Sequence, residues 1–366
     1  MTLHLYFARK FALTFLAIFA VFFALMVLLD IVDQLRRFRG ANIGFAGALR
    51  LSLLATPQIV YRIMPLLIVL TTVALFLGLA RSSEMVVTRA SGRSALRALI
   101  APVLTAMLIG LLGIAVLNPI VAATQVRYEV LADSYRSGGD ISSVLSVSDE
   151  GLWLRQGTAE GQSVIRAGRA NLDGTVLYDV TFLDFDNDGM PVRRIEADSA
   201  SLAPGEWVLE GAKIWPLNEI NPEAASYEEA VLRIPSNLTR DQIRDSFGTP
   251  SAIPIWELPG FIRDLDRAGF SARLHRVWLQ MELATPFFLA GMVLIGAGFT
   301  MRHTRFGRTG QMALIAVGLG LGGYFIRNFA QILGETGQIP VLVAAWAPPL
   351  AAILLSIGLL LHLEDG

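Results

Sequence analysis

FALTFLAIFAVFFALMVLL, residues 11–29, is a run of apolar side chains without a charge or a proline. As an α-helix rising about 1.5 Å per residue, a run of this length crosses the hydrocarbon core of a bilayer, which is about 30 Å thick. The residues before it, MTLHLYFARK, are a short basic lead. A secretory signal would have a shorter apolar core and a small-residue cleavage site. The sequence therefore predicts an uncleaved first membrane span.

Five more runs of the same kind follow the first one. Of the 366 residues, 54% are hydrophobic and 17% are charged, which is too apolar for a soluble enzyme of this length. The formal net charge of −1 gives no reason to expect a nucleic-acid partner. We expect an α-helical membrane protein with six spans, at residues 11–29, 63–80, 98–117, 283–301, 309–326 and 341–361.

The segment between the third and fourth spans has a different composition. It contains short stretches rich in Val, Ile, Tyr, Phe and Trp, separated by turn signals such as NLDG and NDG. The expected strands are GLWLRQ (151–156), SVIRAG (163–168), TVLYDVTFLDF (175–185), WVLEGAKIW (207–215) and EEAVLRIP (228–235). Regular short strands of this kind predict an all-β sandwich or jellyroll-like domain inserted between the spans.

These predictions divide the chain into three parts and orient it. Residues 1–127 hold the first three spans, residues 128–256 the β domain, and residues 257–366 a connecting helix and the last three spans. Lysine and arginine in the short loops are more frequent on the side that holds the N-terminus. Because such loops are usually cytoplasmic, we expect both termini in the cytoplasm and the β domain outside it.

Arg36, Arg37 and Arg39 cluster at the outer end of the first span, against this charge bias. One interpretation is that they extend to lipid headgroups, as long cationic side chains at span ends do. The other is a binding site for an anionic lipid, because a guanidinium group can hold a phosphate through two hydrogen bonds. Asp33 precedes Arg37 by about one helical turn and would hold that arginine in place.

The sequence contains no motif that indicates a catalytic or metal site. The chain has no cysteine, which excludes disulfides and cysteine catalysis. Neither lysine follows a glycine, so a P-loop for ATP is missing. GLGLGG, residues 318–323, lies inside an apolar span, where small residues let helices approach closely. DFDNDG, residues 184–189, resembles the start of a calcium loop, but the flanking strands favour a hairpin turn.

Two charges lie close to or within the predicted spans. Glu282 is near the outer end of the fourth span, and Arg327 is near the outer end of the fifth. The opposed directions of these spans put both residues at a similar depth. Because a single charge is costly there, we expect a structural ion pair rather than a substrate contact.

RSSEMVVTRASG, residues 81–92, connects the second and third spans on the cytoplasmic side. It combines charges with an exposed apolar patch and ends at a helix-stopping glycine. An ordinary tight connector is one interpretation. A surface that docks into a soluble partner explains the apolar patch better, and its contacts would be Glu84, Met85 and Arg89.

The whole chain resembles the LptF/LptG family, the permeases of lipopolysaccharide-export ABC transporters. The resemblance rests on three spans, a β-jellyroll and three more spans, and on Glu84 in the place of the family's coupling helix. DIVDQLRR (30–37) and GLW (151–153) resemble the LptG branch more than the LptF branch.

The resemblance implies a permease, not an enzyme, in the bacterial inner membrane. It would extract lipopolysaccharide from the outer leaflet and pass it to a periplasmic bridge toward the outer membrane. The implied partners are an LptF-like permease, a dimer of the ATPase LptB, LptC and LptA-like jellyroll proteins. ATP and magnesium would be used by the ATPase, and this chain would bind no cofactor.

The same resemblance suggests where the lipid would bind. Arg36 and Arg37, with Asp33 and Arg39 beside them, would meet the lipid A phosphates. Trp153 and Phe182, which we expect to face the interior of the β domain, would line the path of the acyl chains. Two alternatives stay open: a secondary transporter, and a mechanotransmitting ABC permease that moves no lipopolysaccharide.

Overall fold

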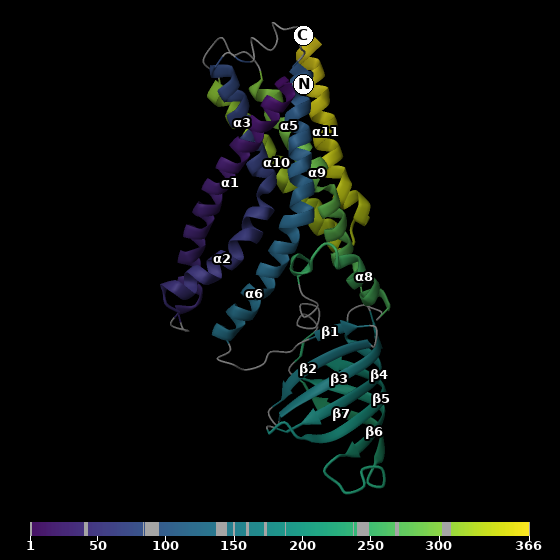
Figure 1. The fold of residues 1–366 in the computed structure, drawn as a ribbon. Coiled ribbons are helices and arrows are strands. Elements are labelled where there is room, and N and C mark those ends of the chain that lie inside the picture. The colour runs from purple at the N-terminus through teal and green to yellow at the C-terminus, as the bar shows by residue number, and fades with distance from the viewer. Residues whose placement is uncertain are drawn as a thin grey trace. The chain divides into compact units, whose positions relative to one another are not determined.

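The computed structural model of the chain combines long helices with an antiparallel sheet (Figure 1). It describes residues 2–39, 43–82, 84, 95–136, 145–148, 151–158, 161–171, 174–186, 188–236, 238–239, 249–267, 271–301 and 309–365. The chain forms two compact units. The first consists of Met1–Asp133, Ser251–Ile255 and Arg273–Gly366, and the second of Ser134–Pro250 and Trp256–Ala272.

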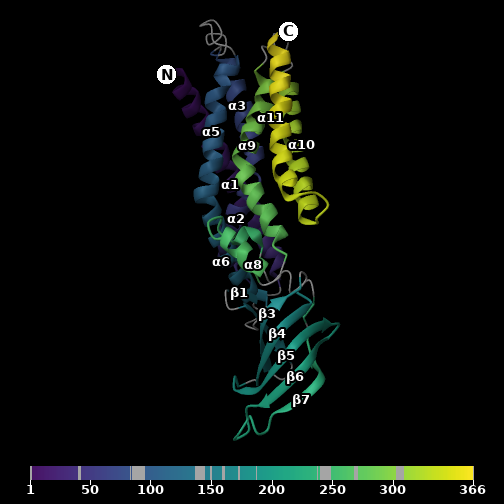
Figure 2. The ribbon, with the colours of Figure 1, turned by 90° about the vertical axis from the view of Figure 1, so that its right-hand side faces the viewer.

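The first unit is built from long helices. They are α1 (Thr2–Arg37), α2 (Phe45–Arg62), α3 (Met64–Arg81), α5 (Ala95–Leu112), α6 (Asn118–Arg136), α9 (Arg273–Thr300), α10 (Thr309–Glu335) and α11 (Val341–Asp365). A π-helical segment, η2 (Gly113–Leu117), joins α5 to α6. Figure 2 shows α9, α10 and α11 running side by side.

The six predicted spans are confirmed. Within the described residues, six helical segments are long and apolar enough to cross a membrane: Leu3–Arg37, Met64–Arg81, Arg97–Ala132, Arg273–Thr300, Gly310–Glu335 and Val341–His362. Each one overlaps a predicted apolar run. Most are longer than the run, because the helices continue through the polar residues that flank it.

The helix α2 was not predicted. Arg50, Pro57 and Gln58 interrupt its apolar pattern, so no uncharged run marks it. Ile63, with φ −90° and ψ 3°, separates α2 from α3. Pro65 then lies in the first turn of α3, where a missing N–H needs no partner. The second span is therefore preceded by a helix that carries polar side chains.

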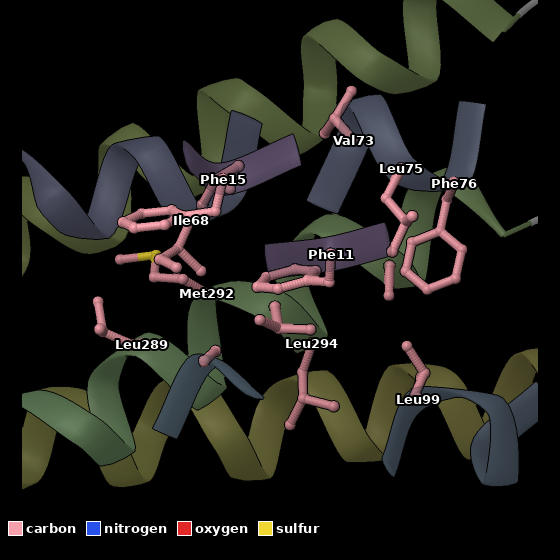
Figure 3. Packing of buried hydrophobic residues seen from close by; sticks show 14 of the residues in the cluster. Phe11, Phe15, Ile68, Val73, Leu75, Phe76, Leu99, Leu289, Met292 and Leu294 are labelled. Carbon is pink, nitrogen blue, oxygen red and sulfur yellow. The ribbon is translucent and has the colours of Figure 1, made fainter. Parts of the chain in front are cut away.

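Aromatic and branched side chains form the core of the first unit. Phe7, Phe11 and Phe15 of α1 are at most 7% exposed. Figure 3 shows Phe11 and Phe15 among side chains of α3, α5 and α9. Lipid tails are as apolar as these side chains, so the association of such helices depends on close van der Waals packing.

The GLGLGG stretch lies in α10 and serves that packing, as predicted. A Cβ atom on Gly320 would lie 2.7 Å from Cγ2 of Val69 in α3, so only glycine fits there. A Cβ atom on Gly318 or Gly322 would meet nothing within 4 Å. One glycine of the stretch therefore sets the approach of α10 to α3.

The second unit contains seven described strands, which confirms the predicted all-β domain. They are β1 (Leu145–Ser148), β2 (Gly151–Thr158), β3 (Gly161–Ala170), β4 (Val176–Phe185), β5 (Pro191–Ala203), β6 (Glu206–Pro216) and β7 (Tyr227–Pro235). Each strand pairs antiparallel with the next, in the order β1 to β7. The buried Ser236, just after β7, donates a hydrogen bond of 2.8 Å to Gln156 of β2. The sheet therefore curls until its two ends approach each other.

Two connections of this unit also follow the predictions. The turn of DFDNDG is a hairpin turn, in which the Asp186 carboxylate accepts hydrogen bonds from the backbone N–H groups of Asp188 and Met190. The connecting helix is α8 (Leu258–Arg267). It buries Leu258, Ile262 and Leu265 on one face, at helical spacing.

Candidate functional site

The C-terminal end of α1 is joined to α6 by side-chain hydrogen bonds. Nη1 of Arg37 donates to the hydroxyl of Tyr128 at 3.0 Å. Gln34 is 2% exposed, and its Nε2 donates to the same hydroxyl at 3.3 Å and to Asp30 at 3.2 Å. Tyr128 therefore fixes one arginine of the cluster from a neighbouring helix.

The structure leaves the predicted arginine cluster exposed. Arg36, Arg37 and Arg39 all reach solvent or lipid, as does Asp33. The expected contact between Asp33 and Arg37 is wrong, because the ion pairs of the described residues do not include it and Arg37 bonds to Tyr128 instead. Arg36 keeps its guanidinium group available for an anion.

A polar pocket of about 80 Å³ lies between α2, α3, α6, α9 and α10. Its lining includes Tyr61, Arg62, Asn118, Glu282 and Arg327. The hydroxyl of Tyr61 donates a hydrogen bond to the Glu282 carboxylate, which is only 3% exposed. Asn118 accepts a hydrogen bond of 2.9 Å from the backbone N–H of Ile255. Apolar helices thus enclose a group of polar side chains.

Glu282 and Arg327 lie near enough to attract each other in this pocket, as predicted, but they do not form a close ion pair among the described residues. Nη2 of Arg327 donates to Thr285 Oγ1 at 3.0 Å and to the Met281 carbonyl at 3.4 Å. Its guanidinium carbon also lies 5.2 Å from the ring centre of Phe288. The ion pairs of the described residues do not join it to Glu282, which Tyr61 has already engaged.

Tyr61, Arg62 and Tyr128 are site residues that the sequence analysis missed. The pocket joins residues from five long helices, and no local sequence pattern brings these together. One signal was available for Tyr61 and Arg62. They stand directly before the apolar run at 63–80, and tyrosine and arginine are typical of the polar end of a span.

The carboxylate of Glu84 lies at the other end of α1. Lys10 Nζ is 2.9 Å from Oε1 and 3.1 Å from Oε2. Tyr6 donates to Oε2 at 2.8 Å, and Ser82 donates to Oε1 at 2.8 Å. Burial alone would raise the pKa of the Glu84 carboxyl, but hydrogen bonds from Lys10, Ser82 and Tyr6 outweigh it and lower that pKa. The predicted contacts Met85 and Arg89 lie outside the described residues.

The two predicted lipid-path residues of the β domain face opposite sides of the sheet. Phe182 is 0% exposed and packs edge-on against Trp207, so it faces inward as predicted. The prediction that Trp153 faces inward is wrong. Trp153 is 37% exposed, because its neighbours Leu152 and Leu154 take the inward positions of the strand. Its ring lies 5.7 Å from the guanidinium carbon of Arg166 on the outer face.

A family model described as lipopolysaccharide export system permease LptF/LptG matches residues 5–362. The chain belongs to the LptF/LptG family. The match runs through both units, so the six spans and the curled sheet are parts of one LptF/LptG architecture.

The relatives in the LptF/LptG family are distant in sequence but similar in length. The lipopolysaccharide export system permease protein LptG of Escherichia coli K12 is 23% identical over 343 residues, which cover 92% of this chain and 91% of the relative. The LptG protein of Haemophilus influenzae is 24% identical over 368 residues, which cover 95% of this chain and 96% of the relative. As an LptF/LptG member with six spans, the chain is a component of a membrane transporter rather than an enzyme.

Proposed function

We propose that the chain is the LptG-type permease subunit of an ABC transporter that extracts lipopolysaccharide from the outer leaflet of the inner membrane. The lipid then passes to a periplasmic bridge that leads to the outer membrane. Both termini are cytoplasmic, and the β domain is periplasmic. Hydrolysis of ATP takes place on a separate ATPase, since neither lysine of this chain lies in a P-loop.

The observation that carries the proposal is the arginine cluster at the C-terminal end of α1. Arg36 and Arg37 are exposed, and Arg37 is oriented by Tyr128 from α6. A guanidinium group fixed in this way binds phosphate with less loss of side-chain entropy than a freely moving one. Each partly dehydrated contact with a lipid A phosphate is expected to contribute about 1.5–3 kcal/mol.

Alanine substitutions test this site. Arg36→Ala and Arg37→Ala should each weaken lipid binding by about ten- to a hundredfold. Arg39→Ala is the matched control from the same cluster and should have a smaller effect, because we assign Arg39 to headgroup anchoring. The measurements are the lipid retained by the purified complex and its transport in proteoliposomes. Normal lipid occupancy in the Arg36/Arg37 double variant, with assembly and ATP hydrolysis intact, would refute the site.

The loop at residues 81–92 is where ATP-driven motion enters this permease. Glu84 supports this assignment, because it stands in a short cytoplasmic connection and its carboxylate is tied to α1. Met85 and Arg89 are the proposed contacts with the ATPase. Glu84→Ala should separate ATP hydrolysis from lipid transport or weaken the association with the ATPase. Unchanged association and coupling in the reconstituted complex would exclude this role.

The partners in the proposal are an LptF-like permease, an LptB-type ATPase dimer, LptC and LptA-like jellyroll proteins. The β domain would hand lipid onward by pairing an edge strand with a neighbouring jellyroll. The curled sheet supports this, because its inner face is apolar and includes Phe182. A photo-crosslinker at Phe182 should capture lipid during transport. The same crosslinker at the outward-facing Trp153 is the matched control, and capture only at Trp153 would contradict the path.

A further inference from the structure

Within the described residues, the Glu84 carboxylate receives four hydrogen-bond contacts from three side chains. Oε1 accepts from Lys10 and Ser82, and Oε2 accepts from Lys10 and Tyr6. Lys10 Nζ also donates to the Tyr6 hydroxyl at 3.0 Å, which links the two α1 residues. An ionised carboxylate offers about four acceptor positions. A partner protein can therefore bond to this carboxylate only by displacing one of these donors.

Two of these donors, Tyr6 and Lys10, belong to a helix that runs without interruption to the arginine cluster. Tyr6 and Lys10 lie in the second and third turns of α1, which continues from Thr2 to Arg37 without an internal proline. A helix of 36 residues is about 54 Å long at 1.5 Å per residue. Proline and other kink sites are what usually allow such a helix to bend. A displacement of the first turns is therefore transmitted along α1 to its other end.

The contacts between Glu84 and α1 tolerate little stretching. They measure 2.8–3.1 Å, and N–H···O contacts weaken beyond about 3.2 Å. A shift of the Glu84 loop by about 1 Å must therefore either move α1 or break these bonds. Arg9, the neighbouring cation on α1, is exposed and forms no ion pair within the described residues. Within the described part of α1, Lys10 and Tyr6 make the connection to Glu84.

We propose that Lys10 and Tyr6 are positioning residues that transmit displacement of the Glu84 loop to α1 and so to Arg36 and Arg37. This inference rests on the proposed function, because it takes the loop as the entry point of ATP-driven motion. It also assigns two different roles to the residues of the loop. Other residues of the loop contact the ATPase, and Glu84 faces α1 as the internal link.

The absence of cysteine from the chain permits a reversible test of Lys10. In the purified complex with its ATPase, Lys10→Cys should preserve assembly and ATP hydrolysis. The lipid released per ATP in proteoliposomes should fall about fivefold, the upper range for a partly exposed ion pair. Aminoethyl methanethiosulfonate restores a positive charge at this position and should recover transport. Ethyl methanethiosulfonate adds similar bulk without the charge and should not.

Arg9→Cys is the matched control, because its cysteine lies at the same end of α1 and can be modified by the same two reagents. It should transport normally before and after either modification. Transport by Lys10→Cys at the level of Arg9→Cys would overturn the link. If Glu84→Ala then still separates hydrolysis from transport, the proposed function survives and only the link to α1 fails. If Glu84→Ala is also normal, the assignment of the loop fails as well.

If the Lys10→Cys complex does not assemble, Tyr6→Phe tests the link between Glu84 and α1. It removes one hydroxyl and leaves the Lys10 contacts and the aromatic ring in place. A loss of lipid released per ATP of about twofold, at an unchanged rate of ATP hydrolysis, is expected for one exposed hydrogen bond. Transport equal to that of the unsubstituted complex would overturn the link.

Discussion

Glu282 is a buried carboxylate whose hydrogen-bond donor is the Tyr61 hydroxyl. We predict that Tyr61→Phe lowers the free energy of unfolding by about 1–3 kcal/mol, because the carboxylate then loses that donor. The measurement is thermal unfolding of the purified chain in detergent micelles. In a Glu282→Gln background, Tyr61→Phe should lower the free energy of unfolding by less. A buried neutral amide that loses a hydrogen-bond donor is destabilised less than a buried carboxylate. Equal losses in both backgrounds would show that the ring, and not the hydroxyl, is what matters.

The Glu84 link should depend on pH in one direction. Its hydrogen bonds hold the pKa of this carboxyl below the ordinary value of 4.5. A group with a lowered pKa contributes stability above its unfolded pKa and loses that contribution as pH falls through the folded pKa. The difference in melting temperature between the unsubstituted chain and Glu84→Gln should therefore persist from about pH 6 to 8 and vanish in strong acid. A difference that grows on acidification would contradict the ion pair.

At the scale of helices, two glycines of one motif should respond in opposite ways to the same substitution. Gly320→Ala places a Cβ atom 2.7 Å from Val69, a stiff and buried side chain, so α10 must move away from α3. We expect a loss of about 1–3 kcal/mol from such overpacking. Gly318→Ala meets nothing within 4 Å and should gain up to about 1 kcal/mol of helix propensity. Thermal unfolding of the two variants side by side makes the comparison, and equal shifts would refute the helix contact.

At the scale of the whole molecule, single cysteines can report the orientation of the chain. Ile220 lies in the β6–β7 connection and is fully exposed, and His362 is exposed near the end of α11. In spheroplasts, Ile220→Cys should react with a membrane-impermeant maleimide. His362→Cys should react only after the inner membrane is opened. Reaction of both before opening would contradict a cytoplasmic C-terminus.

The fold could be predicted from the sequence where the surrounding lipid restricts which residues can be exposed. A helix that crosses lipid needs an apolar surface, so the runs beginning at Phe11 and Val341 identified spans directly. It was a poor guide to β5, whose stretch PVRRIEADSASLA contains few branched or aromatic residues and owes its strand form to pairing with β4 and β6. Trp153 shows a second limit. Successive residues of a strand face opposite sides of the sheet. Which of the two sides is buried is determined only when the sheet folds.

The polar sites were predictable only in part for a related reason. Arg36 and Arg37 stand out because they are adjacent and break the charge bias of the loops. The partners of Glu282 and Arg37, namely Tyr61 and Tyr128, come from other helices and carry no charge. Which of several polar side chains meets a buried charge depends on the rotation of each helix about its own axis. That rotation leaves little trace in a nearly uniform apolar sequence.

The π-helical segment Gly113–Leu117 sets that rotation for the second half of the third span. A π turn takes about one residue more than an α turn. If all five residues wound as a regular α-helix, everything beyond them would turn by about 100°. Tyr128, which lies about three turns later, would then point away from Gln34 and Arg37. Deleting one residue of the segment would instead let a regular α turn replace the π turn and leave Tyr128 facing nearly the same way. The wider turn therefore takes up one residue of this span while the tyrosine stays within reach of the arginine that it positions.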